Sequence, residues 1–282
     1  MNDELRLLTR KFGKPKIDAA IRRLRNFKLE VPSWGFGRGG TRFGVYPDGT
    51  EAKTVLEKIA AAGRVRKMFP VVRSVALHFP WDQWDLDEIL AACRRARLKP
   101  GAINSNTFSV RPEGPLDWRL RYGSLTNPDG ELRRAAVEHH LDCIRIAKKL
   151  GSAILSVWLP DGTNSPGQLS LYEQAELLED SLRKVYRGLG RGMRMLIEYK
   201  CFEPAFYSTA IADYGRAAAL AEKLGGRAAV LVDTGHHPLG TNIEQIVTFL
   251  IRSGRLGGFH FNDHKYADDD LATGSIDRKS VV

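Results

Sequence analysis

Near the C-terminus, three short apolar runs each end in side chains that bind metal ions. The first run ends at Glu198, the second at Asp233 with His236 just beyond it, and the third at His260. Carboxylates and imidazoles at the C-terminal ends of strands are how a β/α barrel assembles its active site. This mixture of oxygen and nitrogen ligands suits a divalent cation such as Mn²⁺, and it is compatible with Mg²⁺, Co²⁺ or Zn²⁺. The pattern predicts a metal-dependent enzyme.

Each ligand candidate also has a plainer interpretation. Glu198 could be a surface carboxylate, although it directly follows an apolar triplet. His260 stands between two phenylalanines, on the strand face that points into the lumen of a barrel, yet a lone histidine there is more often structural. Asp268 and Asp270 share a face of an extended loop and could bind one cation, but alone they would indicate a solvated turn. The combination indicates a metal site, whereas no single residue does.

Further residues could bind a polar substrate beside the metal. Lys200 lies two positions after Glu198 and points the same way, so it could polarise a carbonyl oxygen or simply pair with Glu198. His78 could hydrogen-bond a substrate or be a satisfied core histidine. Trp34 and Trp158 end apolar runs, and aromatic rings at a barrel mouth suit the apolar faces of a sugar, with core packing as the alternative. His237 is interpreted as a packing or supporting residue.

The elements that must position these residues alternate between strand and helix. Apolar residues at spacings of three and four predict helices between seven short apolar runs. Runs that are apolar on successive residues are typical of strands buried on both faces of a parallel sheet. The seven predicted strands are 28–34, 74–78, 100–104, 153–158, 194–198, 228–232 and 258–261. Seven strands with ligands on one edge favour a (β/α)₈ barrel, and barrels typically have about 250 residues.

The 282 residues are interpreted as one TIM-barrel domain. Residues 1–27 form an N-terminal helical extension, residues 28–277 carry strands one to seven, and residues 278–282 are an atypical tail. An eighth strand is not visible, so we expect a chain that is truncated at its C-terminus.

The net charge of +10 raises the question of nucleic acid. The basic residues are spread along helical stretches, which usually indicates solvated helix faces, so nucleic-acid binding is a minor alternative. No apolar run is long enough to cross a bilayer, and the N-terminus lacks a secretory segment. Cys93, Cys143 and Cys201 are odd in number and have no paired spacing, which favours reduced thiols and a cytoplasmic protein.

Taken together, seven segments of the sequence resemble the L-rhamnose isomerases that also interconvert rare aldoses and ketoses. That group belongs to the wider xylose-isomerase-like barrels. The segments are 31–34 with 41–43, 77–82, 104–108, 157–162, 198–200 with 203–207, 232–237 and 258–270. The resemblance covers nearly the whole chain, and its last two motifs are quite specific.

The resemblance implies a site with two cations. The first Mn²⁺ would be held by Glu198, Asp233 and His260, and the second cation by Glu198, His236, Asp268 and Asp270. The implied catalytic residues are Lys200, His78 and Asp270, and the implied sugar contacts are Trp34, His78, Trp158 and Lys200. Two departures stand out: Tyr199 replaces a histidine that is commoner in the family, and an aspartate of the eighth strand is absent.

The implied reaction moves hydrogen between the first two carbons of an open-chain sugar, from L-rhamnose to L-rhamnulose or between related rare sugars. The two cations would bind the carbonyl and neighbouring hydroxyl oxygens. The implied assembly is a homotetramer. Two other interpretations stay open: a metal-dependent endonuclease for abasic DNA on the same barrel type, and an inactive truncated isomerase.

Overall fold

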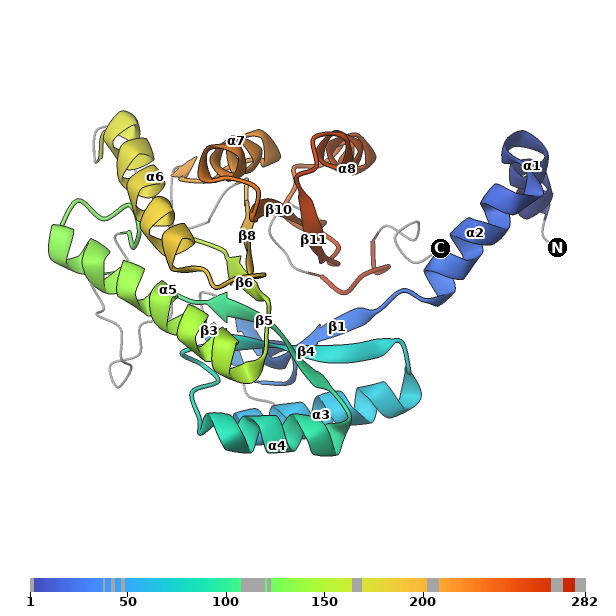
Figure 1. Ribbon diagram of the computed structural model, residues 1–282, viewed down its shortest axis with the longest axis horizontal. Coiled ribbons are helices and arrows are strands. Elements are labelled where there is room, and N and C mark those ends of the chain that lie inside the picture. The colour runs from blue at the N-terminus through green and yellow to red at the C-terminus, as the bar shows by residue number, and fades with distance from the viewer. Residues whose placement is uncertain are drawn as a thin grey trace. The chain divides into compact units, whose positions relative to one another are not determined.

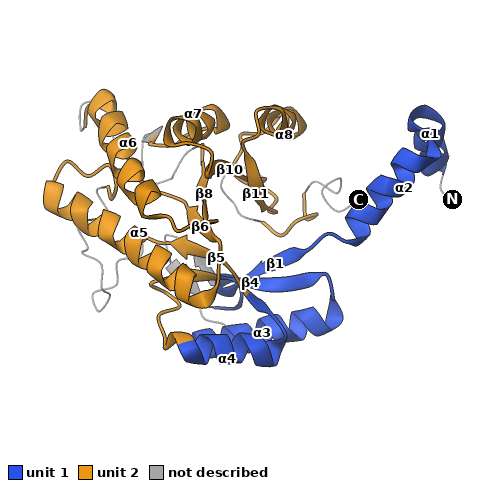
Figure 2. Cartoon of the chain, viewed as in Figure 1, with its two compact units in different colours: residues 1–76, 87–99 blue, residues 77–86, 100–282 orange. Residues whose placement is uncertain are grey.

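The computed structural model describes residues 3–37, 39–41, 44–46, 49–107, 120, 123–163, 169–201, 208–264 and 271–276. Its contacts divide the chain into two compact units, which Figure 2 colours separately. Unit 1 consists of Met1–Ala76 and Asp87–Lys99, and unit 2 consists of Leu77–Leu86 and Pro100–Val282. The sequence-based interpretation of the chain as one barrel domain stays a prediction.

Unit 1 begins with two helices, as the sequence predicts for the N-terminal extension. Its elements are α1 (Asp3–Phe12), α2 (Lys14–Arg25), β1 (Leu29–Pro32), the 3₁₀ helix η1 (Ser33–Phe36), β2 (Gly39–Thr41), β3 (Gly44–Tyr46), α3 (Val55–Met68), the first part of β4 (Val72–Phe79) and most of α4 (Leu86–Ala96). Helix α3 starts with a capping box: Thr54 accepts a hydrogen bond from the backbone N–H of Glu57, whose carboxylate accepts one from the Thr54 N–H. Strand β1 runs parallel to β4.

Unit 2 continues the alternation of strands and helices (Figure 1). Its elements are β5 (Lys99–Ser105), α5 (Gly130–Leu150), β6 (Ile154–Val157), β7 (Gly162–Thr163), α6 (Leu171–Gly188), β8 (Arg194–Glu198), β9 (Ser208–Thr209), α7 (Tyr214–Leu224), β10 (Ala228–Asp233), α8 (Ile243–Arg252) and β11 (Leu256–His260). Helix α5 packs against β6, α7 against β8 and β10, and α8 against β11. Within the described ranges, every helix falls short of the length and apolarity that a bilayer crossing requires.

The large sheet has the strand order β1-β4-β5-β6-β8-β10-β11, with β4 divided between the two units. The pairs β1–β4, β5–β6, β6–β8, β8–β10 and β10–β11 are all parallel. Consecutive parallel strands joined by helices confirm the α/β class and the barrel-type topology that the sequence predicts.

The strands in the middle of the order are buried on both faces, as predicted. All six residues of β10 are buried, and so are four of the five residues of β8. The prediction of two-sided burial is wrong for β1 and β11, whose residues are half-exposed or exposed. These two strands stand first and last in the strand order, so each has a strand neighbour on one side only within the described residues.

Strand boundaries differ from the predicted ones where local chemistry overrides apolarity. The first strand was predicted to reach Trp34, but it ends at Pro32, and Trp34 lies in η1, where its carbonyl accepts from the N–H of Gly37 at 3.1 Å. The last strand begins at Leu256 and not at 258. The prediction missed its start because Gly257 interrupts the apolar run, although the close approach of other residues requires a glycine there. A Cβ at Gly257 would lie 2.5 Å from Leu196 Cδ2 and 2.9 Å from the Val230 oxygen.

Candidate metal centre

Three strand ends in unit 2 present their last side chains on one face of the sheet. Glu198 is the last residue of β8, Asp233 of β10 and His260 of β11. In the parallel register Glu198 pairs with Leu231, and Asp233, two residues further on, pairs with His260. Paired residues, and residues two apart in a strand, share a face, so the three functional side chains point the same way.

These side chains are close enough to share a cation. Ligand atoms of Glu198, Asp233 and His236 all lie within 4.8 Å of one another, and the three residues are buried. His260 Nδ1 lies 3.3 Å from Glu198 Oε1 and 3.7 Å from Asp233 Oδ2. Two buried carboxylates facing each other are costly without a compensating positive charge. The donor set of two carboxylates and two imidazoles therefore fits a divalent cation of the Mn²⁺ or Zn²⁺ type.

The ring of His236 is oriented by the contacts of its Nδ1 nitrogen. Its Nδ1 lies 3.1 Å from the carbonyl oxygen of Tyr199 and 3.3 Å from Glu198 Oε1, both of which can only accept a hydrogen bond. The Nδ1 therefore carries the proton, which leaves the lone pair on Nε2. That atom lies 3.9 Å from Asp233 Oδ2. A ligand histidine with its second N–H held by a carbonyl is the usual supporting arrangement of metal sites.

His260 carries the positive charge in this geometry. Burial alone would lower the pKa of His260, but the neighbouring carboxylates of Glu198 and Asp233 outweigh burial and raise the pKa to about 9. The imidazole is therefore protonated at neutral pH and offsets part of the carboxylate charge. Ligands bind metals in their deprotonated form, so a bound cation would take the place of this proton.

Asp233 is held in place from both sides. Its Oδ1 accepts a hydrogen bond from the N–H of Gly235 at 2.7 Å, and its Oδ2 accepts one from Asn262 Nδ2 at 2.7 Å. The hydroxyl of Thr234 bridges the same two chain segments, since it donates to the Asn262 carbonyl at 2.6 Å and accepts from the Asn262 N–H at 2.9 Å. Asn262 is a supporting residue that sequence reasoning missed; its only signal was an amide two positions after His260.

Tyr199 and His237 form a buried pair beside the candidate ligands. The Tyr199 hydroxyl oxygen lies 2.6 Å from His237 Nε2, and the two rings meet edge to face at 5.4 Å. Burial lowers the pKa of His237 to about 4 and raises the pKa of Tyr199. Both groups are therefore neutral at pH 7, and the hydroxyl donates to the imidazole. His237 is thus buried and bonded, and its role in supporting the metal site stays a prediction.

The structure also brings Lys200 and Trp158 together. Lys200 is buried, and its Nζ lies 5.1 Å from the centroid of the Trp158 ring, which follows β6. The Lys200 N–H donates to the Ile211 carbonyl at 3.0 Å, and the Thr209 hydroxyl donates to the Lys200 carbonyl at 2.7 Å. Hydrogen bonds therefore fix both the N–H and the carbonyl of the Lys200 main chain, and its ammonium lies against an aromatic face.

His78 is the buried next-to-last residue of β4, which ends at Phe79, one residue beyond the predicted strand end. Its N–H donates to Asp82 Oδ2 at 2.9 Å, its ring stacks at a tilt against Trp81 with centroids 4.1 Å apart, and its Nδ1 lies 3.4 Å from Asn106 Nδ2. Trp34 belongs to unit 1, so its role in a sugar pocket stays a prediction.

Two predicted ligands lie outside the described residues. Asp268 and Asp270 fall in the stretch 265–270, so the second cation site stays a prediction. Of the six predicted ligands, the structure brings together the other four.

Asp161 is a buried hub that sequence reasoning missed. Its carboxylate accepts from the N–H and the hydroxyl of Ser124, at 2.8 and 2.6 Å, and from the N–H and the hydroxyl of Thr126, at 3.0 and 2.8 Å. The Asp161 carbonyl accepts from the Ala210 N–H at 2.8 Å. Thr107 in turn donates to the Ser124 hydroxyl at 3.0 Å. Asp161 thus joins the segments that follow β5, β6 and β8.

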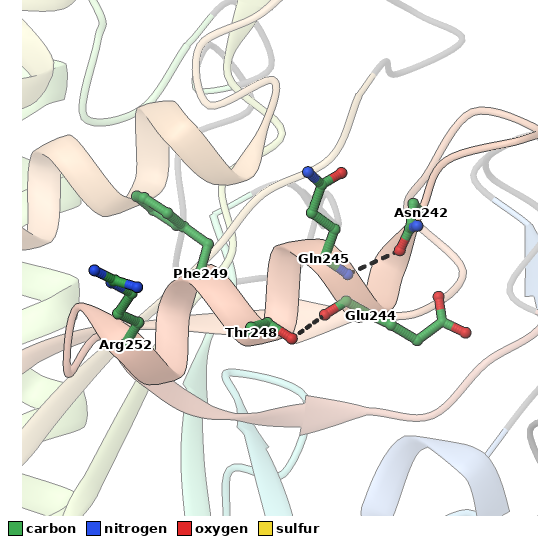
Figure 3. A pocket seen from close by; sticks show the side chains of 6 residues that line it. All are labelled: Asn242, Glu244, Gln245, Thr248, Phe249 and Arg252. Carbon is green, nitrogen blue, oxygen red and sulfur yellow. Dashed lines mark hydrogen bonds between the residues drawn. The ribbon is translucent and has the colours of Figure 1, made fainter.

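A surface hollow on α8 carries none of this chemistry (Figure 3). Its lining comes from one face of the helix and its N-terminal turn: Asn242, Glu244, Gln245, Thr248, Phe249 and Arg252. Two of its polar groups serve the helix itself, since Asn242 Oδ1 accepts from the Gln245 N–H and the Thr248 hydroxyl donates to the Glu244 carbonyl. No candidate metal ligand lines this hollow.

The chain is similar in sequence to proteins named for sugar isomerisation. A protein of Mesorhizobium japonicum named "Probable sugar isomerase" is 44% identical over 261 residues, which are 93% of this chain and 60% of that protein. The L-rhamnose isomerase of Bacteroides thetaiotaomicron is 28% identical over 158 residues, 53% of this chain and 35% of that enzyme. The chain therefore spans about three fifths of the length of the first of these relatives.

The fold has counterparts among solved structures. A D-allulose 3-epimerase from Methylomonas sp. superposes with a TM-score of 0.61 at 13% identity, covering 84% of this chain and 72% of that one. Residues 56–280 match the family described as xylose isomerase-like TIM barrel. With this match over most of its length, the chain belongs to the xylose isomerase-like TIM barrel family.

Proposed function

We propose that this chain carries the metal centre of a sugar isomerase that interconverts an aldose and a ketose, with L-rhamnose or a related rare sugar as substrate. The supporting observation is the cluster of Glu198, Asp233, His236 and His260, of which the first three are buried, together with a buried Lys200 two positions after Glu198. Relatives named for sugar isomerisation match 93% of the chain, which supports the reaction class.

The candidate residues divide into two groups of ligands. Glu198, Asp233 and His260 would hold one divalent cation, with Mn²⁺ as the first candidate. Glu198 and His236 would hold the second together with Asp268 and Asp270. When bound, such cations act as Lewis acids toward the carbonyl and hydroxyl oxygens of an open-chain sugar.

The other residues would bind and orient the sugar. The ammonium of Lys200 would donate hydrogen bonds to an oxygen beside the reacting carbon, where negative charge develops. Trp158, which packs against Lys200, would cover an apolar face of the sugar. Trp34 is a further candidate for a sugar contact. His78 would hydrogen-bond a sugar hydroxyl. We further propose a homo-oligomer, a tetramer by resemblance, in a reducing compartment such as the cytoplasm, which suits the free thiols.

The first experiment is calorimetric titration of Mn²⁺ into the chain, with two matched variants. Glu198→Gln keeps the shape of the side chain but removes its charge, and it is expected to abolish binding. Glu244→Gln alters an acidic residue in the first turn of α8 and is expected to bind like wild type.

The second experiment incubates the Mn²⁺-loaded protein with L-rhamnose and other aldoses and measures ketose formation. Ketose formation that is lost in Glu198→Gln supports the proposal. Mn²⁺ binding that Glu198→Gln leaves unchanged, or metal-dependent cleavage of abasic DNA, would contradict it.

A further inference from the structure

Tyr199 lies between the candidate ligand Glu198 and the candidate substrate residue Lys200, but it points away from both. Successive side chains of an extended chain alternate between faces, so Tyr199 faces away from the ligand cluster. It is 2% exposed. A buried phenol needs a hydrogen-bond partner, and the Tyr199 hydroxyl has one in His237 Nε2 at 2.6 Å.

Tyr199 contacts both histidines that follow β10, by two different parts of the residue. Its carbonyl oxygen accepts the Nδ1–H of His236 at 3.1 Å, and its hydroxyl donates to His237 Nε2. The main-chain contact fixes the tautomer of His236. The side-chain contact fixes His237, so Tyr199 holds the turn that carries both histidines at two points.

The second contact continues into a chain of hydrogen bonds. His237 Nδ1 lies 3.5 Å from the Thr234 carbonyl, so His237 accepts on one nitrogen and donates from the other. The Thr234 N–H donates to the His260 carbonyl at 3.0 Å, and its hydroxyl bonds to Asn262. The Tyr199 hydroxyl is therefore connected, through neutral groups, to the ends of β8, β10 and β11.

We infer that Tyr199 and His237 are a positioning pair that sets the orientation of His236 toward Glu198 and Asp233, and thereby the affinity of the site for a divalent cation. The inference rests on the metal-binding part of the proposed function. Without the hydroxyl, the buried Nε2 of His237 loses its donor, and the turn from Asp233 to His237 loses its side-chain attachment to Tyr199. Supporting hydrogen bonds of this kind typically change metal affinity by about 10- to 100-fold.

The test compares Mn²⁺ affinity across a small set of variants by calorimetry. Tyr199→Phe keeps the ring and the main-chain carbonyl and removes only the hydroxyl. We expect its Kd for Mn²⁺ to rise about tenfold. His237→Leu should weaken binding by a similar factor, and the double variant no more than either single one, because the two residues act as a unit.

Tyr186→Phe is the matched control. It removes the hydroxyl of a partly buried tyrosine that is not next to a candidate ligand in the sequence. That hydroxyl accepts a hydrogen bond from the Arg227 N–H at 3.2 Å. Its Mn²⁺ affinity should equal that of wild type. Melting temperatures with and without Mn²⁺ then separate two roles. A purely structural role lowers the metal-free Tm and leaves Kd unchanged, whereas a positioning role raises Kd and shrinks the Mn²⁺-induced rise in Tm.

The outcomes distinguish this inference from the proposed function. If Glu198→Gln binds Mn²⁺ like wild type, the proposed metal site is wrong, and both the proposed function and the inference about the pair are refuted. If Glu198→Gln abolishes binding while Tyr199→Phe and His237→Leu keep the wild-type Kd, only the positioning pair is refuted. If Tyr199→Phe does not fold, His237→Leu decides the matter, because it removes the other partner of the same hydrogen bond. A Kd about tenfold above wild type supports the pair, and a Kd equal to that of wild type contradicts it.

Discussion

The ammonium of Lys200 lies over the indole ring of Trp158, with its Nζ 5.1 Å from the ring centroid. The two residues come from the ends of different strands, since Lys200 follows Glu198 of β8 by two positions and Trp158 follows β6 directly. Contact with an aromatic face stabilises a buried cation by about 2 kcal/mol. The aromatic ring therefore stabilises a positive charge that is buried two positions after the candidate ligand Glu198.

Replacing Lys200 with methionine is expected to separate sugar binding from metal binding. Lys200→Met removes a charged hydrogen-bond donor, which is worth about 1.5–3 kcal/mol, or roughly 10- to 100-fold in affinity. Titration of the Mn²⁺-loaded protein with L-rhamnose should show that loss, while the Kd for Mn²⁺ changes less than about threefold. Lys184→Met, an exposed partner of Asp180 on α6, is the control and should change neither. Loss of Mn²⁺ binding in Lys200→Met would make Lys200 part of the metal site instead.

Asp161 is expected to matter for stability much more than an exposed aspartate. In Asp161→Asn one of the two acceptor oxygens becomes an NH₂ group that faces the buried donors of Ser124 and Thr126. Each buried donor left without an acceptor costs about 1–3 kcal/mol, so we expect a loss of roughly 2–4 kcal/mol in the free energy of unfolding.

Urea denaturation measures this loss, with Asp180→Asn as the matched control. Asp180 is half-exposed and forms a surface ion pair with Lys184, so its change should be below about 0.5 kcal/mol. Equal effects of the two substitutions would show that the Asp161 hydrogen bonds contribute no more than a surface pair.

His140 is expected to lower the stability of the folded protein in acid. It is fully buried in α5, its Nδ1 lies 2.8 Å from the Ala136 carbonyl, and no described group forms a hydrogen bond with its Nε2. Burial lowers the pKa of His140 to about 3, against about 6.5 in an unfolded chain. Below pH 6.5 the unfolded state therefore binds a proton that the folded state does not bind until about pH 3.

The stability contributed by neutral His140 is present above pH 6.5 and is lost as the pH falls from 6.5 toward 3, by about 1.4 kcal/mol per pH unit. His140→Leu, which is similar in volume, removes this titration. Urea unfolding at pH 7.5 and at pH 5.0 should show a smaller acid loss in His140→Leu than in wild type. The same loss in both proteins would assign the acid sensitivity to other groups.

The three cysteines are expected to differ in reactivity. Cys93 and Cys143 are buried, and burial raises the pKa of the Cys93 thiol to about 11 and raises the pKa of Cys143 as well. Cys201 is partly exposed. Because the thiolate is the reactive form, a thiol reagent should label one cysteine quickly in the folded protein and all three after denaturation. Cys201→Ser should remove the fast phase; a fast phase that survives would place a buried thiol within reach of solvent.

The strands and the ligand cluster could be predicted because their signals are local. The run that ends in Glu198 has the predicted bounds, Arg194–Glu198, and Asp233 ends its strand one residue beyond the predicted end. A run of apolar residues that stops at a carboxylate marks both the strand and the mouth of the barrel. Two ligands on neighbouring parallel strands then meet because in-register strand ends are adjacent.

The supporting contacts could not be predicted, because they depend on the lateral register of strands and on turns. The bond from Asn262 to Asp233 spans 29 positions, and the bond from Tyr199 to His237 spans 38. No periodicity in the sequence pairs such residues. The predicted end of the first strand at Trp34 is wrong for a different reason: the strand ends at a proline and passes into a 3₁₀ turn, and apolarity alone does not show where the strand stops.

The hydrogen bond between Thr107 and Ser124 has a consequence for how the chain after β5 is coupled to the chain after β6. The Ser124 hydroxyl accepts from Thr107 and donates to Asp161, while Thr126 donates to Asp161 independently. One small side chain therefore relays a chain of hydrogen bonds between segments that are far apart in the sequence. Its loss would release Thr107 and one oxygen of Asp161 together, so we expect the ends of these two strands to loosen as a unit and not one at a time.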